Sequence, residues 1–490
     1  MGFLPAMLLV AGVISAGASQ AYSETDHGTR PTCTPDQDTA SLLSVHATEL
    51  QKSARRQKAL HNNWRTTSLT TTAAKRYTIM IDCGSSGTRL FVYSYDATTT
   101  KLLEENKDQD DDLKEIEGIT NTTAFPTPAD VGTAMHGLIK GAIPYVGDAQ
   151  CNTPVYIYAT GGLRYEEPSD VADIWDAVYN ALNVDDIPFS VEKDNMKVLS
   201  GDLEGVYAYV TVHDIRRTGP GTFDDLHLGI LEMGGASLQA AFRPESAVLN
   251  NEFSFAYFDN KTRSVYSKSL QGFGTNEALQ RSFEKIVGST SGWENQTFDH
   301  PCLLLGDVRN VTIFARSPYE KKGSVTFKGT SNPFMCSKLA ESLLNEEYEC
   351  LQEPCGIGGY YFPAHYKEYI GLSSFFYVAN GLSLVPWGQA KVVEPRKFEE
   401  HAWNLVSLTL KQATESSPPS IFKCRPGSMP QDPKGDCTKD KFLKTNGFTG
   451  FLIYHLLTKA WKFDDMSNDI TFALKYMGSS TSWTRGAVIY

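Results

Sequence analysis

Basic side chains are the scarcer charged residues in this chain. Its 490 residues include 45 Lys and Arg against 57 Asp and Glu, which gives a formal net charge of −12. Nonspecific nucleic-acid binding needs clustered Lys and Arg, so this composition argues against a nucleic-acid partner. An anionic substrate is not excluded, because a bound cation can match the charges.

The common nucleotide-binding loops are also missing. No GxxxxGK[ST] pattern occurs, which excludes a P-loop, and no GxGxxG follows a strand pattern as a dinucleotide site requires. The ten histidines show no metal-ligand cluster, and no cysteine spacing matches a zinc site. A phosphate site in this chain must therefore be built in another way.

Long hydrophobic runs are absent except at the N-terminus. There FLPAMLLVAGVISAGASQA is apolar and then small, with small-x-small patterns at 16–18 and 19–21. We interpret 1–21 as a secretory signal peptide, although no basic residue precedes it; the alternative is an uncleaved anchor. The mature chain should then have no membrane span and be secreted or lie in the lumen of the secretory pathway. The segment 451–463 has the spacing of a helix packed on a core.

Secretion predicts disulfide bonds and glycans. With Cys83 set aside as a buried thiol, eight of the nine cysteines remain, and local spacing suggests the pairs Cys350–Cys355 and Cys424–Cys437. The glycan acceptor pattern Asn-x-Ser/Thr occurs four times, at Asn121, Asn260, Asn295 and Asn310.

The pattern along the chain predicts a mixed α/β protein after a polar N-terminal extension, 22–75, in which 39–60 could form an exposed helix. The acidic run 108–118 is typical of a solvated loop. The middle of the chain, about 290–365, is expected to be loop-rich. The other predicted elements are a buried strand entering a glycine turn at 155–162, a helix at 169–183, strand-turn-helix at 196–215, strand-turn-strand at 226–242, helical or mixed segments at 371–386 and 438–463, and a strand-helix pattern at 469–490.

Two short segments share the same sequence pattern. In IDCGSS, which starts at Ile81, and LEMGGAS, which starts at Leu231, an apolar strand leads to an acid, one apolar residue and a turn of small residues. The two lie about 150 residues apart, as equivalent points of two similar domains would. Duplicated α/β domains facing each other would bring both turns to one cleft.

Turns of glycine and serine let the backbone approach a ligand and aim N–H groups at an anion. The acids before them, Asp82 and Glu232, would repel phosphate unless a divalent cation lies between. Either turn alone would be an ordinary hairpin loop, but the pair favours a polyphosphate–metal site. The candidate phosphate-binding residues are Gly84, Ser85, Ser86, Gly87, Thr88 and Arg89 in the first turn and Gly234, Gly235, Ala236 and Ser237 in the second.

A carboxylate beside such a site can act as a general base. Glu204 begins a helix pattern and precedes Gly205, which would let a substrate approach. An acid at a helix start is equally well explained by the helix dipole, and the residues alone leave both readings open. Ser237 and Gln239 follow the second turn and could hold an attacking water.

With these residues the chain resembles the nucleoside triphosphate diphosphohydrolase (apyrase) family of the actin/hexokinase-like superfold. The resemblance runs from about residue 77 to 490 and rests on five short signatures in the family's order. They are IDCGSSGTR (81–89), YATGGLR (158–164), SGDLEGVYAY (200–209), LEMGGASLQ (231–239) and SWTRGA (482–487).

The resemblance implies two RNase-H-like domains with a nucleotide cleft between them. Domain I would comprise 76–200 plus 465–490, and domain II 201–464 with disulfide-rich insertions. It also implies hydrolysis of nucleoside tri- and/or diphosphates with Ca²⁺ or Mg²⁺.

By the same resemblance, Glu204 is the general base, and Ser237 and Gln239 position the water. Asp82, Glu232 and Thr160 hold the metal through bound waters, and Tyr377 packs on the nucleobase.

The chain departs from the family pattern at three places. Glu232 stands where Asp is usual, so the carboxylate is one methylene further out. Thr484 and Arg485 replace a small or apolar residue and Leu, and Gly87 is typical of soluble, diphosphate-preferring members. Two alternatives stay open: a polyphosphate phosphatase or sugar kinase on the same superfold, and a catalytically silent nucleotide-binding or docking protein.

Overall fold

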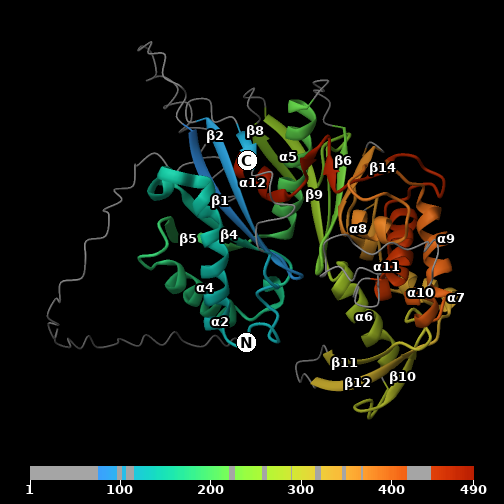
Figure 1. Cartoon of the computed structure of the whole chain (residues 1–490). Coiled ribbons are helices and arrows are strands. Elements are labelled where there is room, and N and C mark those ends of the chain that lie inside the picture. Colours follow the sequence, from blue (N-terminus) through green and yellow to red (C-terminus); the bar gives the residue numbers. More distant parts are fainter. Residues whose placement is uncertain are drawn as a thin grey trace, which may run out of the picture. The chain divides into compact units, whose positions relative to one another are not determined.

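The computed structural model describes residues 75–96, 102–105, 115–219, 227–256, 262–288, 290–314, 322–344, 349–351, 353–365, 368–415 and 443–490. The predicted signal peptide, nearly all of the extension, most of the acidic run, Asn260 and the Cys424–Cys437 pair lie outside these residues. Within them the protein is a mixed α/β structure built on two large sheets (Figure 1).

The first sheet has five strands in the order β3-β2-β1-β4-β5. β1 pairs antiparallel with β2 and parallel with β4, and the outer pairs β2–β3 and β4–β5 continue these directions. Ile79, Met80 and Ile81 of β1 are all fully buried, because side chains on both faces of the sheet are covered. The strands are β1 (Lys75–Cys83), β2 (Thr88–Asp96), β3 (Leu102–Glu105), β4 (Pro154–Ala159) and β5 (Ser190–Val198).

The second sheet has seven strands, and its inner five repeat the arrangement of the first. The order is β14-β15-β13-β6-β7-β9-β8. β6 pairs antiparallel with β7 and parallel with β13, as β1 does with β2 and β4. The two similar segments found in the sequence therefore begin at equivalent strands, β1 and β6, of two sheets with the same strand pairing. The strands are β6 (Gly229–Met233), β7 (Ser237–Phe242), β8 (Glu252–Ala256), β9 (Thr262–Gln271), β13 (Tyr369–Ser373), β14 (Lys391–Val392) and β15 (Ile470–Phe472).

Helices cover the sheets. Val131 and Met135 of α2 (Pro128–Ile139) and Val178 of α4 (Pro168–Leu182) pack in one core with Ile79 and Ile81 of β1. α5 (Gly201–Thr218) lies on β6, β7 and β9 of the second sheet. Further helices in the second half are α6 (Thr275–Val287), α7 (Pro333–Ser342), α8 (Ser374–Gly381), α9 (Pro395–Val406), α10 (Leu410–Glu415) and α11 (Leu443–His455), which continues as a π-helix, Leu456–Ala460.

Most sequence-based elements are confirmed, including α4, α5, the hairpin β6–β7 and the core helix α11. The stretch 290–365 was predicted to be loop-rich, and it also contains regular elements. That stretch holds a three-stranded sheet of β10 (Thr297–His300), β12 (Lys322–Gly329) and β11 (Val308–Phe314), together with α7. Its strands carry β-branched and aromatic residues, which are typical of β-strands, and these residues pack against α6.

The cysteines that the structure describes follow the prediction where it can be compared. Cys350 and Cys355 form a disulfide, and a second bond joins Cys302 to Cys336. Cys83 is a buried free thiol. Asn295 and Asn310 are exposed and Asn121 is half-buried, while their glycosylation stays a prediction. No described helix combines the length and apolar character that crossing a bilayer requires.

The C-terminal segment is shared between the two halves. β15 pairs with β13, so the prediction that 465–490 belongs with the first domain does not hold for this strand. α12 (Trp483–Ile489) packs along α5 and also contacts β1 and β2. The unusual Arg485 is explained here, because its guanidinium pairs with the buried Asp214 of α5 at 2.8 Å.

Replacing Arg485 by leucine should lower the free energy of unfolding by about 1–3 kcal/mol, because Asp214 loses a charged hydrogen-bond donor and, among the described residues, keeps the ion pair with Arg217 at 3.2 Å. The measurement is denaturant unfolding of both proteins. Arg396→Leu, which removes a more exposed ion pair with Glu394, is the control and should change stability less. Equal effects of the two variants would contradict the role given to Arg485.

Candidate active site

The two small-residue turns have the same backbone geometry. In the first hairpin Asp82 pairs with Arg89, and in the second Glu232 pairs with Gln239, seven residues on in both cases. Gly84 N–H donates to Gly87 O at 3.0 Å, and Gly234 N–H donates to Ser237 O at 2.9 Å. Each turn is therefore closed by the same bond, two residues after its acid.

The two turns also approach each other closely. A Cβ atom added to Gly235 would lie 2.4 Å from Ser85 Oγ, and one added to Gly161 would lie 2.7 Å from the Cβ of Ala236. Gln271 Nε2 from β9 donates to Gly161 O at 2.9 Å. Only glycine permits such contacts, so the small residues allow segments of both sheets to meet at one place.

The three predicted catalytic residues contact one another. Gln239 Nε2 donates to Ser237 Oγ at 2.8 Å and to Glu204 Oε2 at 3.2 Å. Glu204 lies in the first turn of α5, whose N-cap Ser200 accepts a hydrogen bond from Leu203 N–H. Ser237 and Gln239 share one face of β7 because side chains alternate along a strand.

Arg164 is a site residue that the sequence reasoning did not single out. Its guanidinium donates to Glu204 Oε2 at 2.7 Å, to Ser237 Oγ at 3.2 Å and to Leu199 O at 2.7 Å. The side chain is 15% exposed and that of Glu204 is 7% exposed. The available signal was an arginine two residues after the glycine pair of the second signature.

Three buried carboxylates interact at this place. Burial, with the nearby Glu204 charge, raises the pKa of Asp82 from 3.8 to about 7, opposed by Arg89. Burial and the Glu204 charge raise the pKa of Glu232 from 4.5 to about 8. Burial also raises the pKa of Glu204, while its ion pair with Arg164 lowers it. Such a cluster of acids is unfavourable unless protons or a cation neutralise it.

The carboxylates fit a divalent cation. Asp82 Oδ1 and Glu232 Oε2 are buried and have no hydrogen-bond partner in the described part of the chain. Thr160 is buried next to the first turn, since its backbone N–H donates at 3.1 Å to the carbonyl oxygen of Cys83, the residue after Asp82. Among the described residues no three His, Cys, Asp or Glu side chains are grouped to bind an ion directly. An ion here would contact these oxygens through water.

Arg89 and Tyr377 lie close to the first turn. Arg89 Nη2 forms an ion pair with Glu115 Oε1 at 2.5 Å, and backbone bonds join Thr88 to Ile116. Tyr377 of α8 is near enough for its hydroxyl to interact electrostatically with Arg89. Its ring stacks on Trp387, with centroids 6.2 Å apart and planes at 26°. An aromatic surface thus adjoins the turn that carries Arg89.

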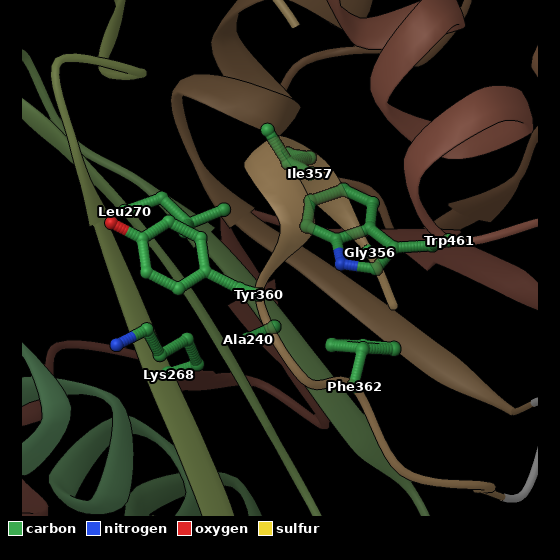
Figure 2. A pocket seen from close by; sticks show the side chains of 8 residues that line it. All are labelled: Ala240, Lys268, Leu270, Gly356, Ile357, Tyr360, Phe362 and Trp461. Carbon is green, nitrogen blue, oxygen red and sulfur yellow. The ribbon is translucent and has the colours of Figure 1, made fainter. Parts of the chain in front are cut away.

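A small pocket elsewhere contains none of the predicted site residues (Figure 2). It lies between β7 and β9 on one side and the loop 356–362 with Trp461 on the other. Lys268 lies over the Tyr360 ring, 4.6 Å from its centroid. Ala240 lines the pocket and directly follows Gln239, so the pocket is on the opposite face of β7 from Ser237 and Gln239.

Comparison with known proteins gives consistent results. The chain is 25% identical over 446 residues to ectonucleoside triphosphate diphosphohydrolase 8 of Bos taurus, covering 84% of this chain and 82% of that protein. It is 28% identical over 332 residues to the Golgi apyrase of Schizosaccharomyces pombe, covering 62% and 56% of the two chains.

A solved structure supports the fold. The chain superposes on the nucleoside triphosphate hydrolase structure from Neospora caninum with a TM-score of 0.57 and 13% identity, covering 90% of this chain and 95% of that one. The GDA1/CD39 (nucleoside phosphatase) family model matches residues 68–490. That match includes both turns, Arg164 and the three catalytic candidates, and the chain therefore belongs to the GDA1/CD39 family of nucleoside phosphatases.

Proposed function

We propose that the protein is an apyrase that hydrolyses nucleoside tri- and/or diphosphates with the help of Ca²⁺ or Mg²⁺. The observation that carries this proposal is the cluster in which Glu204 contacts Gln239, and Gln239 contacts Ser237, beside the buried acids of both turns. A relative named Golgi apyrase favours a place in the secretory pathway. We also propose that the chain forms two RNase-H-like domains, with the nucleotide bound between them.

The phosphate groups would lie against the two turns. Backbone N–H groups within 85–87 and 235–236 and the Arg89 guanidinium would be the donors for them, because the N–H groups of Gly84, Thr88 and Gly234 already bond to backbone carbonyls. Asp82, Glu232 and Thr160 would hold the cation through waters, and a bound cation supplies charge neutralisation of the phosphoryl oxygens. Tyr377 would pack on the nucleobase, an arrangement compatible with its position near Arg89.

The chain's own residues can prepare a water for attack on phosphorus. Ser237 Oγ accepts hydrogen bonds from Arg164 and Gln239, so its own O–H group can donate a hydrogen bond to the water. Gln239 Oε1 is buried without a partner among the described residues and can accept a hydrogen bond from the water. Glu204 then takes the proton as the bond from the water oxygen to the terminal phosphorus forms and the bond from that phosphorus to the bridging oxygen breaks, so that inorganic phosphate and the shortened nucleotide are released. No covalent enzyme intermediate is needed.

Phosphate release by the full-length protein tests the proposal. ATP, ADP, GDP and UDP would be supplied with Ca²⁺ or Mg²⁺, with and without EDTA. We expect release that depends on the cation and is lost in Glu204→Gln. A folded sample that binds nucleotide but releases no phosphate from any of them would favour a silent nucleotide-binding protein.

The cation-free protein should lose stability as the pH rises from about 5 to about 8. The folded pKa values of Asp82 and Glu232 are raised, to about 7 and about 8, so the folded state binds protons more tightly than the unfolded chain. The stability from these protons is complete below the unfolded pKa values, about 4, and is lost as pH passes the folded values.

Denaturant unfolding in EDTA at pH 5, 6.5 and 8 measures this dependence. Added Ca²⁺ should raise the melting temperature more at pH 8 than at pH 5, because it replaces the lost protons. The double variant Asp82→Asn, Glu232→Gln is the control and should show a flatter dependence. An unchanged slope in that variant would contradict the assignment of the effect to these two acids.

A further inference from the structure

Ser373 has an unusual backbone conformation beside the second turn. It ends β13 next to β6, where it pairs with Met233, the neighbour of Glu232. Its φ is 54° and its ψ is −122°. This region suits glycine, and residues with a side chain occupy it at a cost of about 1–3 kcal/mol. Strain of this kind persists where the surrounding structure or a function requires it.

The Ser373 side chain also does not cap the helix that follows it, although serine often has this role. It is the N-cap residue of α8, the helix that carries Tyr377, yet its side chain makes no capping hydrogen bond. A serine cap normally accepts a bond from a backbone N–H and stabilises the helix by about 1 kcal/mol. Here Ser373 Oγ instead donates to Glu232 Oε1 at 2.7 Å.

This bond decides which oxygen of Glu232 is available. Oε1 is held by Ser373, while Oε2 is buried and has no partner in the described part of the chain. Asp82 likewise has one oxygen, Oδ1, that is buried and has no hydrogen-bond partner in the described part of the chain. Each turn thus presents an acid with one buried, unpartnered oxygen.

Glu232 has more need of such a bond than the shorter Asp82. Its extra methylene adds a rotatable torsion, and each free rotamer lowers the fraction of molecules with the carboxylate in place. Ser373, fixed by the end of β13 and the start of α8, selects one arrangement. The strained backbone and the missing cap are the local cost of placing its hydroxyl at Glu232.

We propose that Ser373 is a positioning residue that fixes the Glu232 carboxylate for binding a divalent cation. The proposal rests on the proposed function, in which Glu232 holds the cation through water. It deepens that function by naming the residue that adapts this chain to glutamate at that position.

Calcium titration calorimetry of the full-length protein without nucleotide tests the inference. Ser373→Ala should weaken Ca²⁺ binding about tenfold or more, as expected when a residue that orients a metal-binding group is removed. Ser383→Ala is the matched control, because Ser383 is an exposed serine that also has positive φ, 59°, whereas the hydroxyl that bonds to Glu232 belongs to Ser373. Its Ca²⁺ affinity should equal that of the wild-type protein.

Ser373→Gly separates the hydroxyl from the backbone. Glycine accepts the positive φ without strain, so this variant should melt at or above the temperature of Ser373→Ala. It also lacks the hydroxyl, so its Ca²⁺ affinity should be as weak as that of the alanine variant. In both variants hydrolysis should recover as Ca²⁺ is raised to saturation.

The outcomes are distinct. Wild-type affinity in Ser373→Ala, or normal affinity in Ser373→Gly with weak affinity in Ser373→Ala, would overturn the inference and leave the proposed function intact. Absence of Ca²⁺ binding by the wild-type protein would overturn both the cation site and the inference. If Ser373→Ala does not fold, Ser373→Gly carries the test.

Discussion

Replacing Glu204 by glutamine should lower kcat by about 10²–10⁴-fold, the usual effect of losing a positioned general base. Glutamine keeps the size of the side chain and can still bond to Gln239, but it cannot take a proton from water. Nucleotide affinity should change little, because the phosphate contacts assigned to the two turns remain. Steady-state kinetics gives kcat, and nucleotide binding in EDTA gives the affinity.

Glu400→Gln is the matched control for this variant. Glu400 lies in an exposed ion pair with Lys397 on α9, so the same chemical change there should leave kcat unaltered. Equal kcat in Glu204→Gln and the wild-type protein would remove Glu204 from the mechanism. A loss of both kcat and folding would show a structural role for Glu204, which circular dichroism and the melting temperature would reveal.

Replacing Arg164 by glutamine should reduce both stability and activity. Arg164 and Glu204 form a largely buried ion pair at 2.7 Å, and removing one partner of such a pair destabilises proteins by up to about 3–5 kcal/mol. The Arg164 charge lowers the pKa of Glu204, so its removal raises that pKa further. Since the base must be ionised, the acid limb of the pH–kcat profile should move to higher pH.

The double variant Arg164→Gln, Glu204→Gln shows how much of the stability loss comes from leaving the Glu204 charge unpaired. It removes both charges, so the protein should regain part of the stability lost in Arg164→Gln, as measured by denaturant unfolding. Arg164→Lys keeps a charge without the planar fork of donors and should give an intermediate pH profile. An unshifted profile in Arg164→Gln would mean that Arg164 acts only in packing.

The sequence by itself determined the repeated strand, acid and turn. Apolar runs on both sides of 84–87 and of 234–236 could form little else than two hairpins, because period and turn composition are local properties. It likewise determined α4, α5 and the Cys350–Cys355 bond, in which the interacting residues are close in the chain. The signatures around Asp82, Glu204 and Glu232 indicated the family to which the chain belongs.

Only the tertiary structure decided which side chains meet. Arg164 and Glu204 are 40 positions apart, and Ser373 and Glu232 are 141 apart, so no local pattern relates them. The same holds for β15, which joins the second sheet beside β13, and for Arg485, which pairs with Asp214 across 271 positions. Burial raises the pKa values of the turn acids, and burial arises only when both sheets and their helices are packed.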